Sequence, residues 1–264
     1  MVALTALVAL GAGGSARAGA TLLVTTDPAA VAAFSSGATV LGFDEGVGNL
    51  WPPGSPVSEF AEVGDQYAGC AGVVFSSGGD GPAAAVGTFN TPLQGDAASP
   101  WNVLGPTQNF GFFVSLDYDA PIQMRFIDPE GLPVPMARVG AWNDPTGSRI
   151  RLSAFDANDV LIASVEADQG FFLGIETDPS GSPIARTVVE HLANQAGLGY
   201  TLDNVTLLPR RPADLNRDGV VDGADLGLLL NAWGPCPEAC CLGDLTGDGV
   251  VDGADLGALL SRWS

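Results

Sequence analysis

Between Thr21 and Leu208 the chain alternates short apolar segments with turn-forming residues. The apolar segments are rich in β-branched and aromatic residues, which favour the pleated, half-buried surface of a strand. The turns contain Gly, Pro, Asn and Asp, as in 128–131 and 143–147. Short strands at a spacing of about 8–12 residues are typical of an antiparallel β-sandwich, so we expect a mainly β domain. The predicted strands are 39–43, 72–75, 110–116, 122–127, 138–142, 150–155, 160–165, 171–175, 185–189 and 200–207.

One short helix is predicted within this domain, over residues 28–34. The stretches 46–66 and 76–100 lack a strand pattern and are predicted to be long loops. Trp142 and the pairs Phe112/Phe113 and Phe171/Phe172 lie inside strand patterns. We expect them in the core, because aromatic side chains dominate core burial.

The last fifty residues follow a different, helical period. Apolar side chains recur at i, i+3, i+4 and i+7, which is one face of a helix. The first set is Leu226, Leu229, Leu230 and Trp233, and the second is Leu256, Leu259, Leu260 and Trp263. The second set follows the first after 30 residues, and a repeat at this interval indicates one supersecondary unit used twice. Since neither helix can bury its own stripe, we expect the two helices to pack against each other.

An Asp- and Gly-rich loop precedes each predicted helix, over 214–225 and 244–255. Oxygen ligands at loop positions 1, 3, 5, 9 and 12, a backbone carbonyl at 7 and Gly at 6 describe an EF-hand calcium loop. The first loop offers Asp214, Asn216, Asp218, the Val220 carbonyl, Asp222 and Asp225. The second offers Asp244, Thr246, Asp248, the Val250 carbonyl, Asp252 and Asp255. Each loop carries several carboxylates that repel one another without a cation, so we expect Ca²⁺ binding and folding to be coupled.

Two departures from an EF-hand point to a family. Position 12 is Asp instead of Glu in both loops, and prolines in 209–212 and 235–237 leave no helix before either loop. With its near-identical loop–helix copies, the segment 213–264 resembles a type I dockerin. This resemblance implies two Ca²⁺ sites and a cohesin-like or surface partner, which could dock in either of two orientations. Loop positions 10 and 11, which read the partner in dockerins and are often Ser-Thr, are Gly-Ala in both copies here.

The sandwich also resembles a group of proteins. The segments 138–142, 152–159, 171–176 and 202–206 resemble exported bacterial jelly-roll domains similar to galactose-binding-like carbohydrate-binding modules. Such domains often hold a calcium ion between their first and last strands, which implies a third metal site. Its candidate ligands are Asp44, Glu45, Asp203 and Asn204, with ordinary exposed turn and edge residues as the alternative. Trp51 and Trp101, which lie beside prolines, are the candidates for an exposed glycan platform.

Charge and length bound the function. The chain has 264 residues, a net charge of −20 and ten arginines but no lysine, which argues against nucleic acids and anionic membrane surfaces as partners. Val2–Leu10 is apolar and 16–18 fits an A-x-A cleavage site, so residues 1–20 are predicted to be a secretory signal; an apolar N-terminal strand is the alternative. No apolar stretch is long enough to insert in a membrane. We therefore expect a secreted or cell-surface protein with a sandwich over 21–208, a linker over 209–212 and the module over 213–264.

Four cysteines fit an oxidising compartment and allow three pairings. Cys236 is expected to bridge to Cys240 or Cys241, and Cys70 then either pairs with the remaining one or stays free. The single histidine, His191, offers no zinc-ligand spacing.

The chain contains no nucleophile-elbow motif. A catalytic triad would have to use His191, and no carboxylate pair, such as Glu130 with Glu166, is singled out for glycoside hydrolysis. We therefore expect a protein that is not an enzyme, whose module attaches a polysaccharide-binding or structural sandwich to a partner. The alternatives are an extracellular polysaccharide-degrading hydrolase carrying a dockerin, and a repeat that only caps and stabilises the chain.

Overall fold

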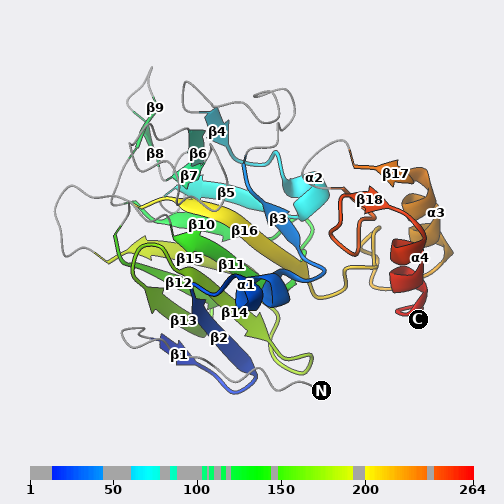
Figure 1. Cartoon of the computed structure of the whole chain (residues 1–264), viewed down its shortest axis with the longest axis horizontal. Coiled ribbons are helices and arrows are strands. Elements are labelled where there is room, and N and C mark those ends of the chain that lie inside the picture. Colours follow the sequence, from blue (N-terminus) through cyan, green and yellow to red (C-terminus); the bar gives the residue numbers. More distant parts are fainter. Residues whose placement is uncertain are drawn as a thin grey trace.

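The structure is a computed structural model that describes residues 14–43, 61–77, 84–87, 103–105, 107–109, 114–116, 120–143, 148–192, 200–236 and 241–264. Within these residues the chain is mainly β, with antiparallel sheets and four short helices (Figure 1). The helices are α1 (Pro28–Ser35), α2 (Ala68–Ala71), α3 (Gly223–Asn231) and α4 (Gly253–Leu260). None of these helices combines the length and the apolar character needed to cross a lipid bilayer.

One antiparallel sheet has six strands in the order β1-β13-β12-β15-β10-β5. These strands are β1 (Gly14–Ala16), β13 (Leu161–Ala167), β12 (Ile150–Phe155), β15 (Arg186–His191), β10 (Ile122–Arg125) and β5 (Val74–Ser77). In β12 the side chains of Ile150 and Leu152 are buried, while Arg151 lies on the opposite face. The sheet therefore has one apolar face toward the core and one polar face.

A second sheet has eight strands, in the order β2-β14-β11-β16-β7-β6-β4, with β3 also paired to β16. These strands are β2 (Ala20–Thr25), β14 (Phe172–Thr177), β11 (Met136–Asn143), β16 (Leu202–Pro209), β7 (Val103–Gly105), β6 (Ala84–Gly87), β4 (Ala61–Val63) and β3 (Thr39–Leu41). Two small ribbons pair β8 (Thr107–Asn109) with β9 (Val114–Leu116), and β17 (Gly234–Pro235) with β18 (Val250–Val251).

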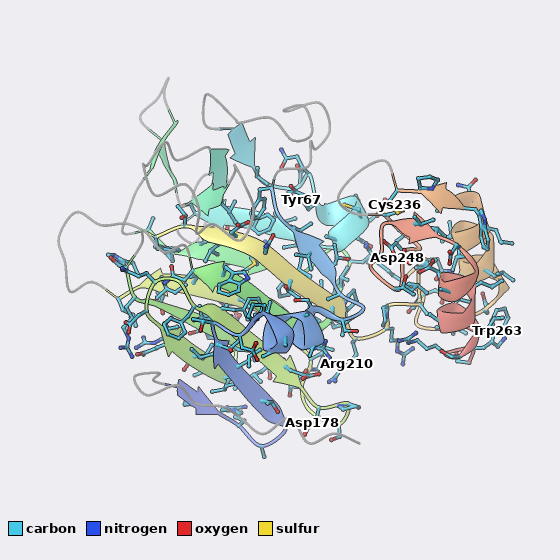
Figure 2. All side chains as sticks on the ribbon, viewed as in Figure 1. Tyr67, Asp178, Arg210, Cys236, Asp248 and Trp263 are labelled. Atoms are coloured by element: carbon cyan, nitrogen blue, oxygen red, sulfur yellow. A yellow bond between two sulfur atoms is a disulfide. The ribbon has the colours of Figure 1, made fainter. Side chains whose placement is uncertain are left out.

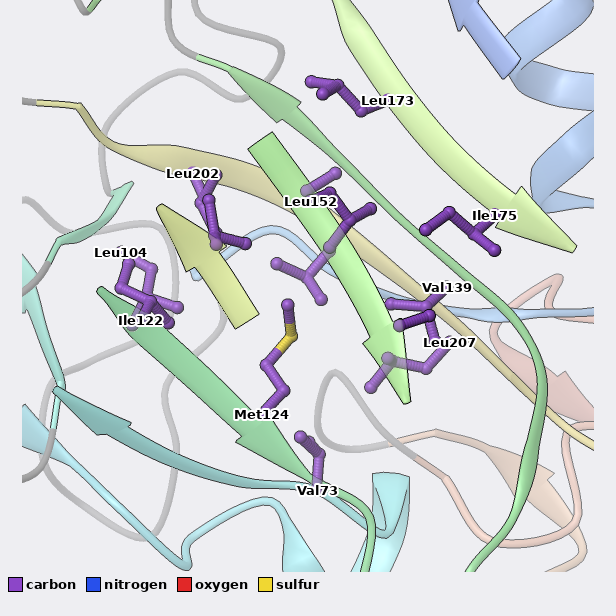
Figure 3. Close-up of a cluster of buried hydrophobic side chains, with 14 of the residues drawn as sticks. Val73, Leu104, Ile122, Met124, Val139, Leu152, Leu173, Ile175, Leu202 and Leu207 are labelled. Carbon is purple, nitrogen blue, oxygen red and sulfur yellow. The ribbon is translucent and has the colours of Figure 1, made fainter. Parts of the chain in front are cut away.

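The two large sheets share one hydrophobic core. Met124 and Leu152 from the six-stranded sheet and Val139 and Leu207 from the eight-stranded sheet belong to the same buried cluster (Figure 3). Each of these side chains is at most 1% exposed. Two antiparallel sheets with a common core are consistent with the expected β-sandwich. Each predicted strand is present where it falls in the described residues, and residues 110–113 of one of them lie outside these residues. The expectation of long loops over 46–66 and 76–100 is wrong in part, because β4 and β6 lie within them and pair in the eight-stranded sheet.

Helix α1 lies on the face of the eight-stranded sheet that points away from the other sheet. It corresponds to the helix predicted over 28–34. Asp27 caps it by accepting a hydrogen bond from the Ala29 N–H at 3.0 Å, and Pro28 occupies the first turn. Phe34 packs edge-on against Phe172, with 5.4 Å between ring centroids. The predicted core residue Trp142 is partly buried and packs against Phe172, so these two join Phe34 in a small second core. The predicted pair Phe112/Phe113 lies outside the described residues.

The expected signal segment overlaps this sheet structure. Residues Gly14–Ala16 form edge strand β1, whose residues pair with Ala163–Val165 of β13. The β1 residues are exposed, so the six-stranded sheet would keep its core if cleavage after Ala18 removed them. The signal remains a prediction.

Gly140 of β11 provides a test of the packing between α1 and the sheet. A Cβ at this position would lie 2.5 Å from the Phe172 ring and 2.9 Å from the Leu173 carbonyl oxygen. Gly140→Ala is therefore expected to lower the free energy of unfolding by about 1–3 kcal/mol, because overpacking forces backbone shifts. Chemical denaturation measures this loss. Gly69→Ala in α2 is the matched control, since its Cβ would lie at an ordinary 3.6 Å from Pro129, and equal stabilities for the two variants would contradict this account.

Candidate functional site

The C-terminal residues form two equivalent loop–helix units beside the sandwich (Figure 1). Each helix begins at loop position 10 and is capped by the aspartate at position 9. The Asp222 carboxylate accepts a hydrogen bond from the Ala224 N–H at 2.8 Å, and Asp252 accepts one from Ala254 at 2.7 Å. Both caps are capping boxes, so the loop carboxylates also define where α3 and α4 start.

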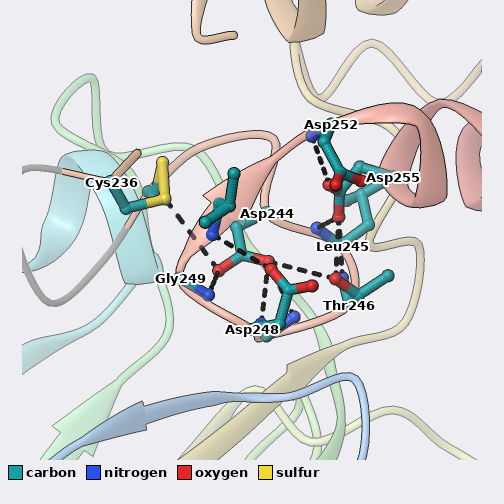
Figure 4. The surroundings of a disulfide bond; sticks show 11 residues. Cys236, Asp244, Leu245, Thr246, Asp248, Gly249, Asp252 and Asp255 are labelled. Atoms are coloured by element: carbon teal, nitrogen blue, oxygen red, sulfur yellow. Dashed lines mark hydrogen bonds between the residues drawn. A yellow bond between two sulfur atoms is a disulfide. The ribbon is translucent and has the colours of Figure 1, made fainter. Parts of the chain in front are cut away.

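The aspartates at position 12 are fully buried and join the two ends of each loop. Asp225 accepts hydrogen bonds from the backbone N–H groups of Leu215, Asn216 and Asp222 at 2.7–3.0 Å. Asp255 accepts the equivalent three bonds at 2.8–3.0 Å (Figure 4). The two copies therefore fold in the same way. A carboxylate that accepts several backbone N–H bonds holds its charge in a buried site.

The aspartates at position 1 hold the sharp turn in each loop. Asp214 accepts a hydrogen bond from the Gly219 N–H at 2.9 Å, and Asp244 accepts one from Gly249 at 2.8 Å. Both glycines have positive φ angles, 90° and 86°, which explains why position 6 must be Gly.

One oxygen in the first loop lacks a partner. Asp214 Oδ1 is buried without a hydrogen bond. Burial raises the pKa of Asp214, and the nearby carboxylates of Asp225 and Asp218 raise it further. A buried acceptor without a donor, surrounded by like charges, costs free energy that a cation would offset.

The loops offer only oxygen donors, which suits a hard cation such as calcium. Several of these oxygens accept hydrogen bonds within the loops; for example, Asp218 Oδ1 accepts the Val220 N–H at 2.9 Å. Among the described residues, no group of three or more His, Cys, Asp or Glu side chains is arranged so that it could hold a metal ion. The expected ligand sets also include the side-chain oxygens of Asn216 and Thr246 and the carbonyl oxygens of Val220 and Val250. Calcium binding at these loops therefore stays a prediction.

Backbone pairing joins the two units at two places that are related by the thirty-residue repeat. Gly234, which follows α3, pairs with Val251 of the second loop. Ser264, which follows α4, donates its N–H to the Val221 carbonyl of the first loop at 3.1 Å. Each helix exit thus pairs with the loop of the other unit. Val221, Val251, Leu229 and Leu259 are buried in one small core that the units share.

The two helices pack against each other as expected, but this packing buries only part of each apolar stripe. Leu229 and Leu259 are fully buried, but Leu230 and Leu260 are 52% and 51% exposed. Trp233 and Trp263 are 49% and 47% exposed. Trp263 lies on the outer side of the units, away from the sandwich (Figure 2). Eight- and nine-residue helices crossing once can bury only the first part of a stripe against each other.

A disulfide bond cross-links the segment just before the second loop. Cys236 and Cys241 are joined in a disulfide, which is one of the two expected pairings. Cys70 is also disulfide-bonded, which contradicts the alternative in which it stays free. Cys240 lies outside the described residues.

Other candidates are placed only in part. Asp203 is 1% exposed and accepts the Asn204 N–H at 2.7 Å. Because Val205 pairs with Leu41, both residues lie beside the end of β3. Asp44, Glu45, Trp51 and Trp101 lie outside the described residues, so the third metal site and the glycan platform are untested. The His191 ring stacks on Tyr200, with 6.2 Å between ring centroids.

A polar groove that the sequence reasoning missed lies on the outer face of the six-stranded sheet. Its cavity volume is about 430 Å³, and its lining residues are Gly14, Ser15, Arg151, Ser153, Phe155, Leu161, Ser164, Glu166 and Glu190. Arg151 pairs with Glu166 at 2.6 Å and with Glu190 at 3.9 Å. Arg149 also pairs with Glu166, at 3.2 Å. The alternation in 150–155 identifies the outward residues of one strand, but the neighbours across the sheet depend on strand order.

The hydrogen bond from Arg151 is the main reason why the pKa of Glu166 is lowered, and Arg149 adds to the effect. Glu166 therefore stays ionised in moderately acidic solution. Glu130 lies in the turn after β10, whereas Glu166 lies in β13, on another element.

Comparison with known proteins adds little. No protein-family model matches the chain, and no curated protein matches it. Among solved structures, it is similar to the enzymatically active domain of tailspike protein 4 from bacteriophage CBA120, with 18% sequence identity and a TM-score of 0.29. This similarity covers 58% of this chain and only 21% of the tailspike chain. A similarity this weak carries no argument about function.

Proposed function

We propose that this chain is an exported calcium-binding protein. Its dockerin-like module, residues 213–264, attaches a jelly-roll-like sandwich to a surface or scaffold partner. The observation that carries the attachment role is the duplicated set of exposed apolar side chains on the module. These side chains are Val220, Leu230 and Trp233 in one unit and Val250, Leu260 and Trp263 in the other. Large apolar side chains exposed in this number on a small module favour a protein interaction site.

Calcium is the cation that the loops fit best. In the first loop Asp214, Asn216, Asp218, Val220, Asp222 and Asp225 would hold one Ca²⁺, and their equivalents thirty residues later would hold the second. The proposal is supported by the unpartnered Asp214 Oδ1 and by the oxygen-only donor set. Bound calcium would supply the counter-charge that the loop aspartates lack.

The exposed side chains favour attachment over the simpler role of a stabilising cap. A cap buries its apolar surface against the domain that it stabilises. Here the large side chains of Leu230, Leu260, Trp233 and Trp263 are about half exposed, and Trp263 lies away from the sandwich.

A second candidate function belongs to the sandwich, which we propose binds a neutral glycan in the polar groove. Arg151 lines the groove together with Glu166 and Glu190, and Arg149 pairs with Glu166 from beside it, so each glutamate has an arginine partner. Ion pairing holds these donors and acceptors in place, an arrangement that suits the hydroxyl groups of a sugar better than a charged ligand. Leu161 and Phe155 supply apolar contacts at the same groove.

The groove supports binding more than hydrolysis. Arg151 lies between Glu166 and Glu190 across three neighbouring strands. A general acid in a glycoside hydrolase needs a raised pKa, whereas the pKa of Glu166 is lowered. Glu166 is therefore unsuited to act as the proton donor of a hydrolase in this groove.

Calcium titration calorimetry on the whole chain tests the module. We expect two binding events, with helix content rising by circular dichroism because metal binding and folding are coupled. Asp225→Ala and Asp255→Ala should each remove one event, and Glu130→Ala, an exposed acid in a sandwich turn, should remove neither. A third event would support the site at Asp44, Glu45, Asp203 and Asn204. A chain that takes up no calcium would overturn the proposal.

The exposed leucines test attachment. Binding to immobilised cohesin domains, measured by surface plasmon resonance, should require calcium. Leu230→Ser together with Leu260→Ser should weaken it at least about tenfold, since a central apolar contact contributes more than about 1 kcal/mol. Leu132→Ser is the control, because Leu132 is 56% exposed on the sandwich. Equal losses for the control and the double variant, or binding without calcium, would contradict the proposed surface.

Affinity electrophoresis in gels containing neutral polysaccharides tests the groove. Retardation of the protein should fall at least about fivefold in Arg151→Ala, because Arg151 is the central donor and fixes both glutamates. Arg262→Ala, a change on the module, should leave retardation unchanged. Unaltered retardation in Arg151→Ala would assign glycan binding to another surface.

A further inference from the structure

The expected calcium loops, not the helices, face the sandwich. A cavity of about 260 Å³ lies between the two parts, and the position 1 residues of both loops, Asp214 and Asp244, line it. On the sandwich side Ala71 and Pro133 line the same cavity. Helices α3 and α4 lie on the outer side of the units (Figure 1). The module therefore presents its loops inward and its helices outward.

Loop position 4 makes the closest contacts with the sandwich. Arg217 pairs with Asp128, which follows β10, at 3.6 Å between Nη1 and Oδ2. Asp128 is only 6% exposed, so water screens this ion pair less than a surface pair. The equivalent residue in the second loop is Gly247. A Cβ there would lie 3.2 Å from the Ala38 carbonyl oxygen, so a larger residue would press on the turn between α1 and β3.

These contacts bear on one of the differences between the two loops. The twelve-residue loops are identical except at positions 3 and 4, which are Asn216-Arg217 in one and Thr246-Gly247 in the other. A module that moved freely on a tether would have no reason to differ at position 4. A docked module needs a cation opposite Asp128 in one loop, and close backbone approach in the other.

The residues expected to form a linker are also fixed. Pro209 belongs to β16, and the Arg210 N–H donates to the Pro135 carbonyl at 2.8 Å. The Arg210 guanidinium donates to the carbonyls of Asp178 and Gly181 (Figure 2). Pro209 and Arg210 of the expected linker are thus held on the sandwich surface, next to the start of the module.

We propose that the first calcium loop is also the docking element of the module, so that calcium binding and docking stabilise each other through Arg217 and Asp128. This inference rests on the proposed calcium binding. An ordered loop holds Arg217, with its positive φ of 62°, in place for the ion pair. By linkage, a docked Arg217 must then favour calcium binding by the same factor. Calcium would increase the local stability of the sandwich near Asp128. Helices α3 and α4, on the outer side of the module, would stay free for a partner.

The test compares the whole chain with Asp128→Asn, a change in the sandwich that leaves every expected calcium ligand intact and keeps the acceptor for Leu132. In the unmodified chain, calcium should increase amide hydrogen-exchange protection over 126–134 as well as over the loops. In Asp128→Asn the increase over 126–134 should disappear. One calcium site should weaken about two- to five-fold in calorimetry, the range expected for a single ion pair.

Arg217→Gly, which makes position 4 of the first loop match the second, should have the same effect. Arg262→Ala, on the outer side of the module, should have none. Two calcium sites with no change over 126–134 in the unmodified chain would overturn the coupling but leave calcium binding intact. A chain that takes up no calcium would overturn both.

Discussion

The buried carboxylate at position 12 is the constraint on which the C-terminal part depends. Asp225 and Asp255 accept three backbone N–H bonds each, and these bonds join the start of a loop to its end and to the first turn of a helix. A charge buried in this way is stable only while all of its partners stay in place. The loop, the helix start and the small shared core therefore form as one cooperative unit.

The sandwich and the module expose different kinds of surface. The sandwich buries its apolar residues between two sheets and leaves polar side chains outside, including the ion-paired groove over β12, β13 and β15. The module is too small to bury its own apolar stripes, and it leaves Leu230, Leu260 and Trp233 about half exposed, as is Trp263 on the side away from the sandwich (Figure 2). This division of surfaces fits the two proposed roles, with the sandwich as the domain that is carried and the module as the element that attaches it.

Near-identity of the repeats makes their differences informative. Ten of the twelve loop positions are the same in both copies, and position 4 differs where each loop touches a different part of the sandwich. Internal duplication provides a built-in comparison, because both copies share one fold and only their surroundings vary. The asymmetry of those surroundings, Asp128 on one side and the Ala38 carbonyl on the other, accounts for an arginine in one loop and a glycine in the other.

The sequence by itself determined the local elements. Alternation predicted the strands around 122–127 and 150–155, helical spacing predicted α3 and α4, and Gly219 and Gly249 were expected at the sharp turns where the structure has positive φ. These features depend on neighbours within a few residues. The strand order, the groove built by Arg151, Glu166 and Glu190, and the contact of Arg217 with Asp128 join residues far apart in the chain. Only the tertiary structure decided them, because periodicity tells which face a side chain occupies but not which strand or loop lies opposite.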